Sequence, residues 1–150
     1  MRLNWLLLLA LSCFIVACEK APEVEISSAS MEMIRRGVEL MPTYCHTCHG
    51  VGDFAIDEML APPLWAVRAN YLAKYPEPEA FVEAMAAFIT EPTVAESLMP
   101  SEVLRYGLKA PVSLSKEEIR AVAWAIYAGR VERPVWLREY QKRHRKSNAI

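Results

Sequence analysis

The sequence predicts an all-α fold in a single domain, and three observations lead to this prediction. Apolar residues recur at the three- and four-residue spacing of amphipathic helices in several stretches. No stretch shows the sustained alternation of a strand, and no internal repeat is visible. The chain has 150 residues, of which 53% are hydrophobic and 23% charged, as expected for one globular domain, which we place at residues 30–129. Its formal net charge of −1 argues against a nucleic-acid partner.

The amino terminus has the pattern of an export signal. Residues 5–16 form an apolar stretch behind Arg2 that is too short to span a bilayer comfortably. The small and apolar residues that lead into Cys18 resemble the lipobox of bacterial lipoproteins. By this resemblance residues 1–17 are a signal peptide, Cys18 is the lipidated first residue, and the protein is anchored to a bacterial membrane, facing the periplasm. An ordinary cleaved signal with an incidental cysteine is the alternative.

Residues 18–29 are polar and contain proline, and they are predicted to form a tether between the lipid and the domain. A first helix is predicted to begin at Ser30, whose hydroxyl can cap it, and to stop at Pro42. Its apolar residues recur at helical spacing and are Met31, Ile34, Val38 and Met41.

Three more helices are predicted further along the chain. The segments 64–72 and 79–89 each follow two prolines, which fix the backbone ahead of a helix. The last helix begins at Ser115, which forms a capping box with Glu118, and it continues to Tyr127. The predicted apolar stripes are Phe81, Met85, Phe88 and Ile89 in segment 79–89, and Ile119, Val122, Ala123 and Ile126 in the last helix.

Charge is unevenly distributed along the chain. Once residues 1–17 are removed, the basic tail at residues 130–150 carries a net charge of +5 and the rest carries −7. Within the tail, Pro134 can begin a helix that places Trp136 and Tyr140 on one face. The tail is predicted to be a solvated extension that packs partly on the domain. The alternative is that it docks on an acidic partner or on anionic lipid.

Cys45, Cys48 and His49 form the C-x-x-C-H arrangement of c-type haem attachment. Two thiols three positions apart on a helical turn can each add to one vinyl group of a porphyrin, and the adjacent histidine then reaches the iron from the same side. His46, between the cysteines, is expected to face solvent. Three alternatives share the same residues. They are a redox-active cysteine pair, which normally follows a strand, a zinc site, which needs four ligands, and a disulfide.

Over about residues 31–128 the sequence resembles class I cytochromes c. Gly37 lies eight positions before Cys45, where that family places a small residue so that the first and last helices cross closely. The last predicted helix resembles the family's terminal helix, although the family's aromatic residue would stand at Ala125 and the chain has Trp124 one position earlier. The resemblance implies a class I cytochrome c fold, with helices wrapped around one covalently attached haem c.

The same resemblance assigns contacts around the haem. The Ala-Pro-Pro-Leu segment at residues 61–64 is similar to the family's Gly-Pro-x-Leu segment. In that family the proline carbonyl accepts the Nδ1 proton of the proximal histidine. Pro62 is therefore expected to orient His49, and Leu64 to press on the haem.

The sixth iron ligand is predicted to be Met99, which is followed by proline as in many members of the family. Met99 stands fifteen residues before Leu114, farther from the last helix than is usual. Lys109 is the alternative at the usual distance, and Met59, Met85 or an open position are further alternatives.

These features predict an electron carrier rather than an enzyme. No free thiol remains once Cys18, Cys45 and Cys48 are modified, and no second histidine is placed as an acid or base. The expected partners are redox proteins and, through the lipid anchor, a membrane. The alternative function is haem-based binding or sensing of a small gas at a weakly held or open sixth position.

Overall fold

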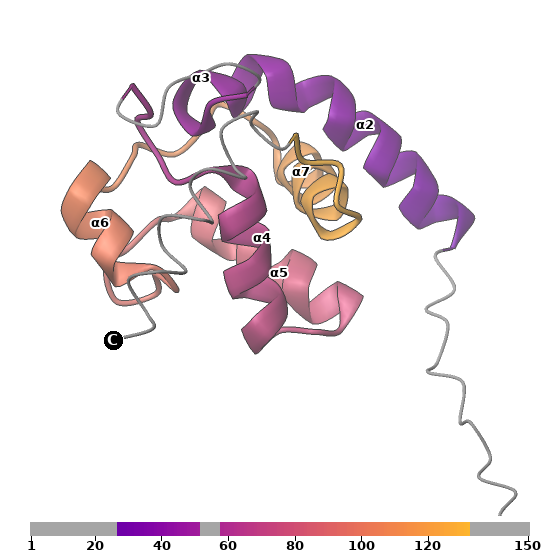
Figure 1. Ribbon diagram of the computed structural model, residues 1–150. Coiled ribbons are helices and arrows are strands. Elements are labelled where there is room, and N and C mark those ends of the chain that lie inside the picture. Colours follow the sequence, from indigo (N-terminus) through magenta and orange to yellow (C-terminus); the bar gives the residue numbers. More distant parts are fainter. Residues whose placement is uncertain (1–26, 52–57, 133–150) are drawn as a thin grey trace, which may run out of the picture.

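The computed structural model describes residues 27–51 and 58–132, and 64% of these residues are helical with no strand among them (Figure 1). The predicted all-α class is therefore confirmed. The signal peptide, Cys18, nearly all of the tether and the tail from residue 133 lie outside the described residues. No helix in the described part of the chain has the length and apolar character needed to cross a membrane. The helices are α2 (Ser28–Tyr44), α3 (His46–His49), α4 (Leu64–Lys74), α5 (Pro78–Thr90), α6 (Pro100–Tyr106) and α7 (Lys116–Tyr127).

Both predicted ends of the first helix were wrong. The cap of α2 is Ser27, whose Oγ accepts a hydrogen bond of 3.1 Å from the N–H of Ser30. At the other end the helix continues through Pro42 and ends at Tyr44. The N–H of Cys45 then closes the last turn on the carbonyl of Met41 at 2.9 Å.

The buried face of α2 is also rotated from the predicted stripe. Ile34 and Met41 are buried as expected, but Met31 and Val38 are 49% and 43% exposed. Gly37 is buried between Ile34 and Met41 instead, because this face packs against α7.

The crossing of α2 and α7 depends on Gly37 (Figure 1). A Cβ atom added at this position would lie 2.0 Å from the carbonyl oxygen of Ala121 and 2.8 Å from the Cβ of Ala125. The backbones of α2 and α7 therefore approach so closely that only glycine fits at residue 37, in agreement with the small residue expected there. Ala125 has a short side chain, which allows α2 to approach α7 at Gly37. The aromatic ring of the neighbouring Trp124 does not lie at this crossing point but makes an edge contact with Tyr127, with 5.8 Å between the ring centroids.

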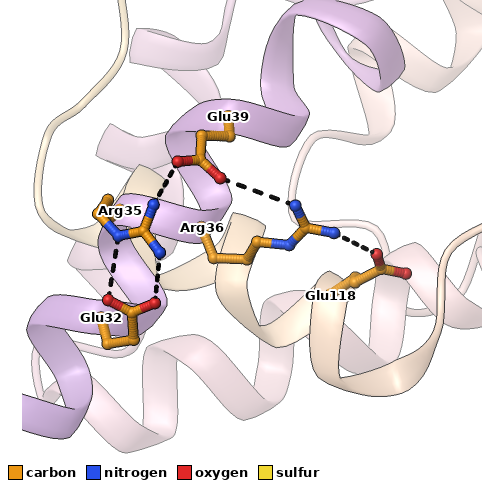
Figure 2. Close-up of polar contacts among 5 residues, drawn as sticks. All are labelled: Glu32, Arg35, Arg36, Glu39 and Glu118. Carbon is orange, nitrogen blue, oxygen red and sulfur yellow. Dashed lines mark hydrogen bonds and ion pairs between the residues drawn. The ribbon is translucent and has the colours of Figure 1, made fainter.

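Ion pairs on the outer surface also link α2 to α7 (Figure 2). The guanidinium of Arg36 lies 2.9 Å from Glu118 at the start of α7 and 3.7 Å from Glu39 on its own helix. Arg35 pairs with Glu39 and, at 2.5 Å, with Glu32. All of these groups are at least partly exposed, so we expect each pair to contribute little to stability.

The predicted capping box of α7 is present. The Oγ of Ser115 accepts from the N–H of Glu118 at 3.3 Å, and the Glu118 carboxylate accepts from the N–H and the hydroxyl of Ser115 at 3.0 Å. These bonds, with Arg36, hold the pKa of Glu118 below its ordinary value. The stripe that follows is buried, namely Ile119, Val122, Ala123 and Ile126, and Tyr127 is partly buried.

Replacing Ser115 with alanine is expected to lower the free energy of unfolding by about 1 kcal/mol, because the N–H of Glu118 in the first turn of α7 loses the hydroxyl oxygen that accepts from it. Denaturant unfolding of the mature protein measures this change. The control is Ser113→Ala, since Ser113 is exposed and precedes the helix. Equal stability of the two variants would contradict the prediction.

The remaining helices complete a layer beside α7. Phe81 and Met85 of α5 are buried as predicted, whereas Phe88 and Ile89 are only partly buried. The sequence did not predict α6, which begins at Pro100 and lies on the opposite side of the molecule from α2 (Figure 1). Helices α4 and α5 both pack against α7, which is the centre of the fold.

Candidate functional site

A large apolar cavity lies among the helices and reaches the C-x-x-C-H segment. Its volume is about 200 Å³. The helical side chains in its walls include Leu64, Val67 and Tyr71 of α4, Met85 of α5, and Ile119, Val122 and Ile126 of α7.

Backbone hydrogen bonds hold the motif at the edge of this cavity. The carbonyl of Cys48 accepts from the N–H groups of Leu60 and Ala61 at 3.1 and 2.9 Å. These bonds bring the segment that contains Pro62 against α3. Gly50, with a φ of 61°, ends the turn in a conformation that other residues rarely adopt.

His49 is held as the resemblance implies. Its Nδ1 lies 2.5 Å from the carbonyl oxygen of Pro62, and since a carbonyl only accepts, Nδ1 carries the proton. The other ring nitrogen, Nε2, is then a lone-pair donor on a residue that lines the cavity. Burial lowers the pKa of His49, which favours the neutral ring that binds metals.

The two cysteines lie differently. Cys45 lines the cavity, and burial, together with the nearby Cys48, raises the pKa of its thiol to about 11. Cys48 follows three positions later, where its N–H donates to the carbonyl of Cys45 at 3.2 Å. Both are partly buried free thiols. The arrangement offers two sulfur atoms and one imidazole on a single turn.

The candidates for the sixth iron ligand differ in whether they line the cavity. Met99, Lys109 and Met85 line the cavity, whereas Met59 is buried and does not. Met99 is fixed at the start of α6, where its N–H donates to Ser97 Oγ at 3.1 Å. The Nζ of Lys109 donates to the carbonyl of Tyr106 at 2.6 Å.

The structure also explains the unusual distance of Met99 from the last helix. The residues between them include α6 (Pro100–Tyr106), so the extra length is folded rather than an open loop. Met99 therefore remains at the cavity although Leu114 is fifteen residues away.

The thioredoxin-like alternative for the cysteine motif loses support, because the segment that leads into the motif is α2 rather than a strand. Within residues 27–51 and 58–132, no three His, Cys, Asp or Glu side chains gather closely enough to hold a metal ion.

Sequence reasoning missed Tyr71 as a cavity residue. It is 5% exposed, and burial, followed by the nearby Tyr75 and Glu96, raises the pKa of its hydroxyl to about 12. A signal was present, because Leu64, Val67 and Tyr71 recur at the spacing of one helical face. The residues from α6, such as Val103 and Tyr106, gave no such signal.

Comparisons of the chain with protein-family models, with curated proteins and with solved structures found no significant match.

Proposed function

We propose that this chain is a monohaem c-type cytochrome that carries single electrons between redox partners. The observation on which the proposal rests is the placement of His49 beside an apolar cavity, with Nδ1 engaged by Pro62 and Nε2 left as a ligand. The thiols of Cys45 and Cys48 on the same turn are the proposed attachment points for haem c.

The residues present fit such a group. The walls are largely apolar, as a porphyrin face requires, and Leu64 at the start of α4 is buried against the cavity beside Pro62 and His49. The bound haem would supply an iron that alternates between ferrous and ferric states. The chain supplies attachment, a fixed imidazole orientation and exclusion of water.

Met99 is the proposed sixth ligand. It lines the cavity directly before α6, whereas His49 is the last residue of α3, and Figure 1 shows where these two helices lie. The soft thioether of methionine favours ferrous iron and so raises the reduction potential. Lys109 is the weaker candidate, because its amine already donates a hydrogen bond to the carbonyl of Tyr106.

The same proposal covers fold, location and partners. The crossing at Gly37 and the His49–Pro62 contact support a class I cytochrome c fold. Cleavage before Cys18 and its lipidation would anchor the protein to a bacterial membrane on the periplasmic side, where c-type haem is attached. Redox proteins on that side are the proposed partners, and the role is that of a carrier, not an enzyme.

Absorption spectra of the oxidised and reduced mature protein, with carbon monoxide added to the reduced form, test this function. We expect a c-type haem spectrum and slow binding of carbon monoxide, because Met99 holds the sixth position. Met99→Leu is expected to bind carbon monoxide rapidly and to have a lower reduction potential.

Two controls separate the alternatives. Met31→Leu changes a methionine that is 49% exposed on α2 and should leave both measurements unchanged. Rapid carbon monoxide binding by the unmodified protein would favour the gas-binding function instead. Opening of the site by Lys109→Gln and not by Met99→Leu would assign the ligand to Lys109.

A further inference from the structure

The backbone of Met99 is held by hydrogen bonds on both sides. Its N–H donates to the Oγ of Ser97 at 3.1 Å. Its carbonyl accepts from the N–H groups of Glu102 and Val103, in the first turn of α6, at 3.0 and 3.1 Å. Met99 therefore cannot rotate locally without breaking at least one of these bonds.

Met99 is also the first residue of a helical face that lines the cavity. Met99, Glu102, Val103 and Tyr106 recur at the spacing of one side of a helix, and all four line the cavity. Leu104, which lies outside this face, is 90% exposed. The first turn of α6 therefore fixes the point from which the side chain of Met99 reaches the cavity.

The bonds that hold Met99 use only its backbone, so its thioether stays available at the cavity. Lys109 differs, because the Nζ that would bind iron is the atom that donates to the carbonyl of Tyr106 at 2.6 Å. Lys109 is also exposed, and it follows Gly107, where an added Cβ would meet nothing within 4 Å. Of these two candidate ligands, Met99 is the one whose position is fixed before a cofactor binds.

Ser97 is the residue that holds Met99 from the amino-terminal side. It is partly buried and lines the cavity, and its own N–H lies 3.4 Å from the carbonyl oxygen of Val94. The same loop contains an equivalent bond away from the cavity, where the Oγ of Thr93 accepts from the N–H of Glu96 at 3.3 Å. Thr93 does not line the cavity. The loop therefore offers two similar hydroxyl bonds, of which only that of Ser97 reaches Met99.

We propose that Ser97 is a positioning residue for the sixth ligand, an inference that rests on the proposed function with Met99 in that role. The Ser97 hydroxyl and the first turn of α6 together hold Met99 at the cavity. With the cofactor bound, they keep the sixth position closed to competing small molecules. A competing ligand binds only to the fraction of molecules in which Met99 has left the iron, so its apparent affinity measures that fraction.

Carbon monoxide binding to the reduced mature protein tests this role in Ser97→Ala and in the matched control Thr93→Ala. We expect about fivefold tighter binding in Ser97→Ala, which is the change in population that the loss of one ordinary hydrogen bond gives. The reduction potential of this variant is expected to fall, because Met99 favours ferrous iron. Thr93→Ala should change neither value, and Ser97→Thr, which keeps a hydroxyl, should restore both.

Hydrogen exchange at the amide of Met99 supplies a measurement that does not involve iron. It is expected to be about fivefold faster in Ser97→Ala and unchanged in Thr93→Ala, because only the first variant loses the acceptor.

The results separate this inference from the proposed function. If Met99→Leu opens the sixth position but Ser97→Ala leaves carbon monoxide affinity and potential unchanged, the function stands and the role of Ser97 is refuted. If Met99→Leu opens nothing, Met99 is not the ligand and both assignments fail. Equal effects of Ser97→Ala and Thr93→Ala would show general loosening of the loop and would also refute positioning by Ser97.

Discussion

Gly37→Ala is expected to destabilise the mature protein by about 3 kcal/mol or more, as overpacking in a core that cannot relax does. The new Cβ would lie 2.0 Å from the carbonyl oxygen of Ala121. That atom belongs to the backbone of α7, so no rotation of a side chain can relieve the clash. The helices must move apart, and α7 is also the helix against which α4 and α5 pack. Denaturant unfolding measures the loss.

Two companion variants show whether the crossing is the cause. Gly107→Ala adds the same methyl group where nothing lies within 4 Å, at a φ of 71°, so it is expected to cost only about 1 kcal/mol through backbone strain. Ala125→Gly combined with Gly37→Ala removes the 2.8 Å contact but not the one to Ala121. Full recovery of stability in that double variant would show that the backbone contact does not matter.

The sequence predicted the features that depend on neighbours in the chain. The capping box of Ser115 and Glu118 and the buried stripe of α7 are local patterns, and both are present. Near the start of α2 the same reasoning chose Ser30 as the cap and was wrong, because Ser27, another hydroxyl residue three positions earlier, caps the helix. Only the packing of Gly37 against α7 decides which face of α2 is buried.

The cavity could be predicted only in part. His49 and Pro62 were joined by resemblance to a family, and the structure places them 2.5 Å apart. Helix α6 was missed because it has seven residues and exposes Leu104, so it shows no amphipathic pattern. The residues that line the cavity come from helices that are far apart in sequence. A local sequence pattern cannot predict which faces of these helices pack against one another.

Cys45→Ser combined with Cys48→Ser is expected to leave little stable protein, because the cofactor that we propose would no longer be retained. A cavity of about 200 Å³ left empty costs about 5 kcal/mol at roughly 24 cal/mol per Å³. The whole stability of a small domain is about 5–15 kcal/mol. Losing the cofactor contacts of the helices around the cavity therefore removes between about a third of this stability and all of it. Circular dichroism and thermal unfolding of the purified variant measure the result.

The matched control is Thr47→Ala, which changes an exposed residue of the same turn and keeps both thiols and His49. It is expected to retain the haem spectrum and cooperative unfolding. A double serine variant with native helix content and a cooperative transition would show that the apolar walls close without a cofactor. The hydrophobic core would then be stable without a cofactor, and the hydrogen bond between His49 and Pro62 would only position a core histidine. The proposal of an electron carrier would lose its structural basis.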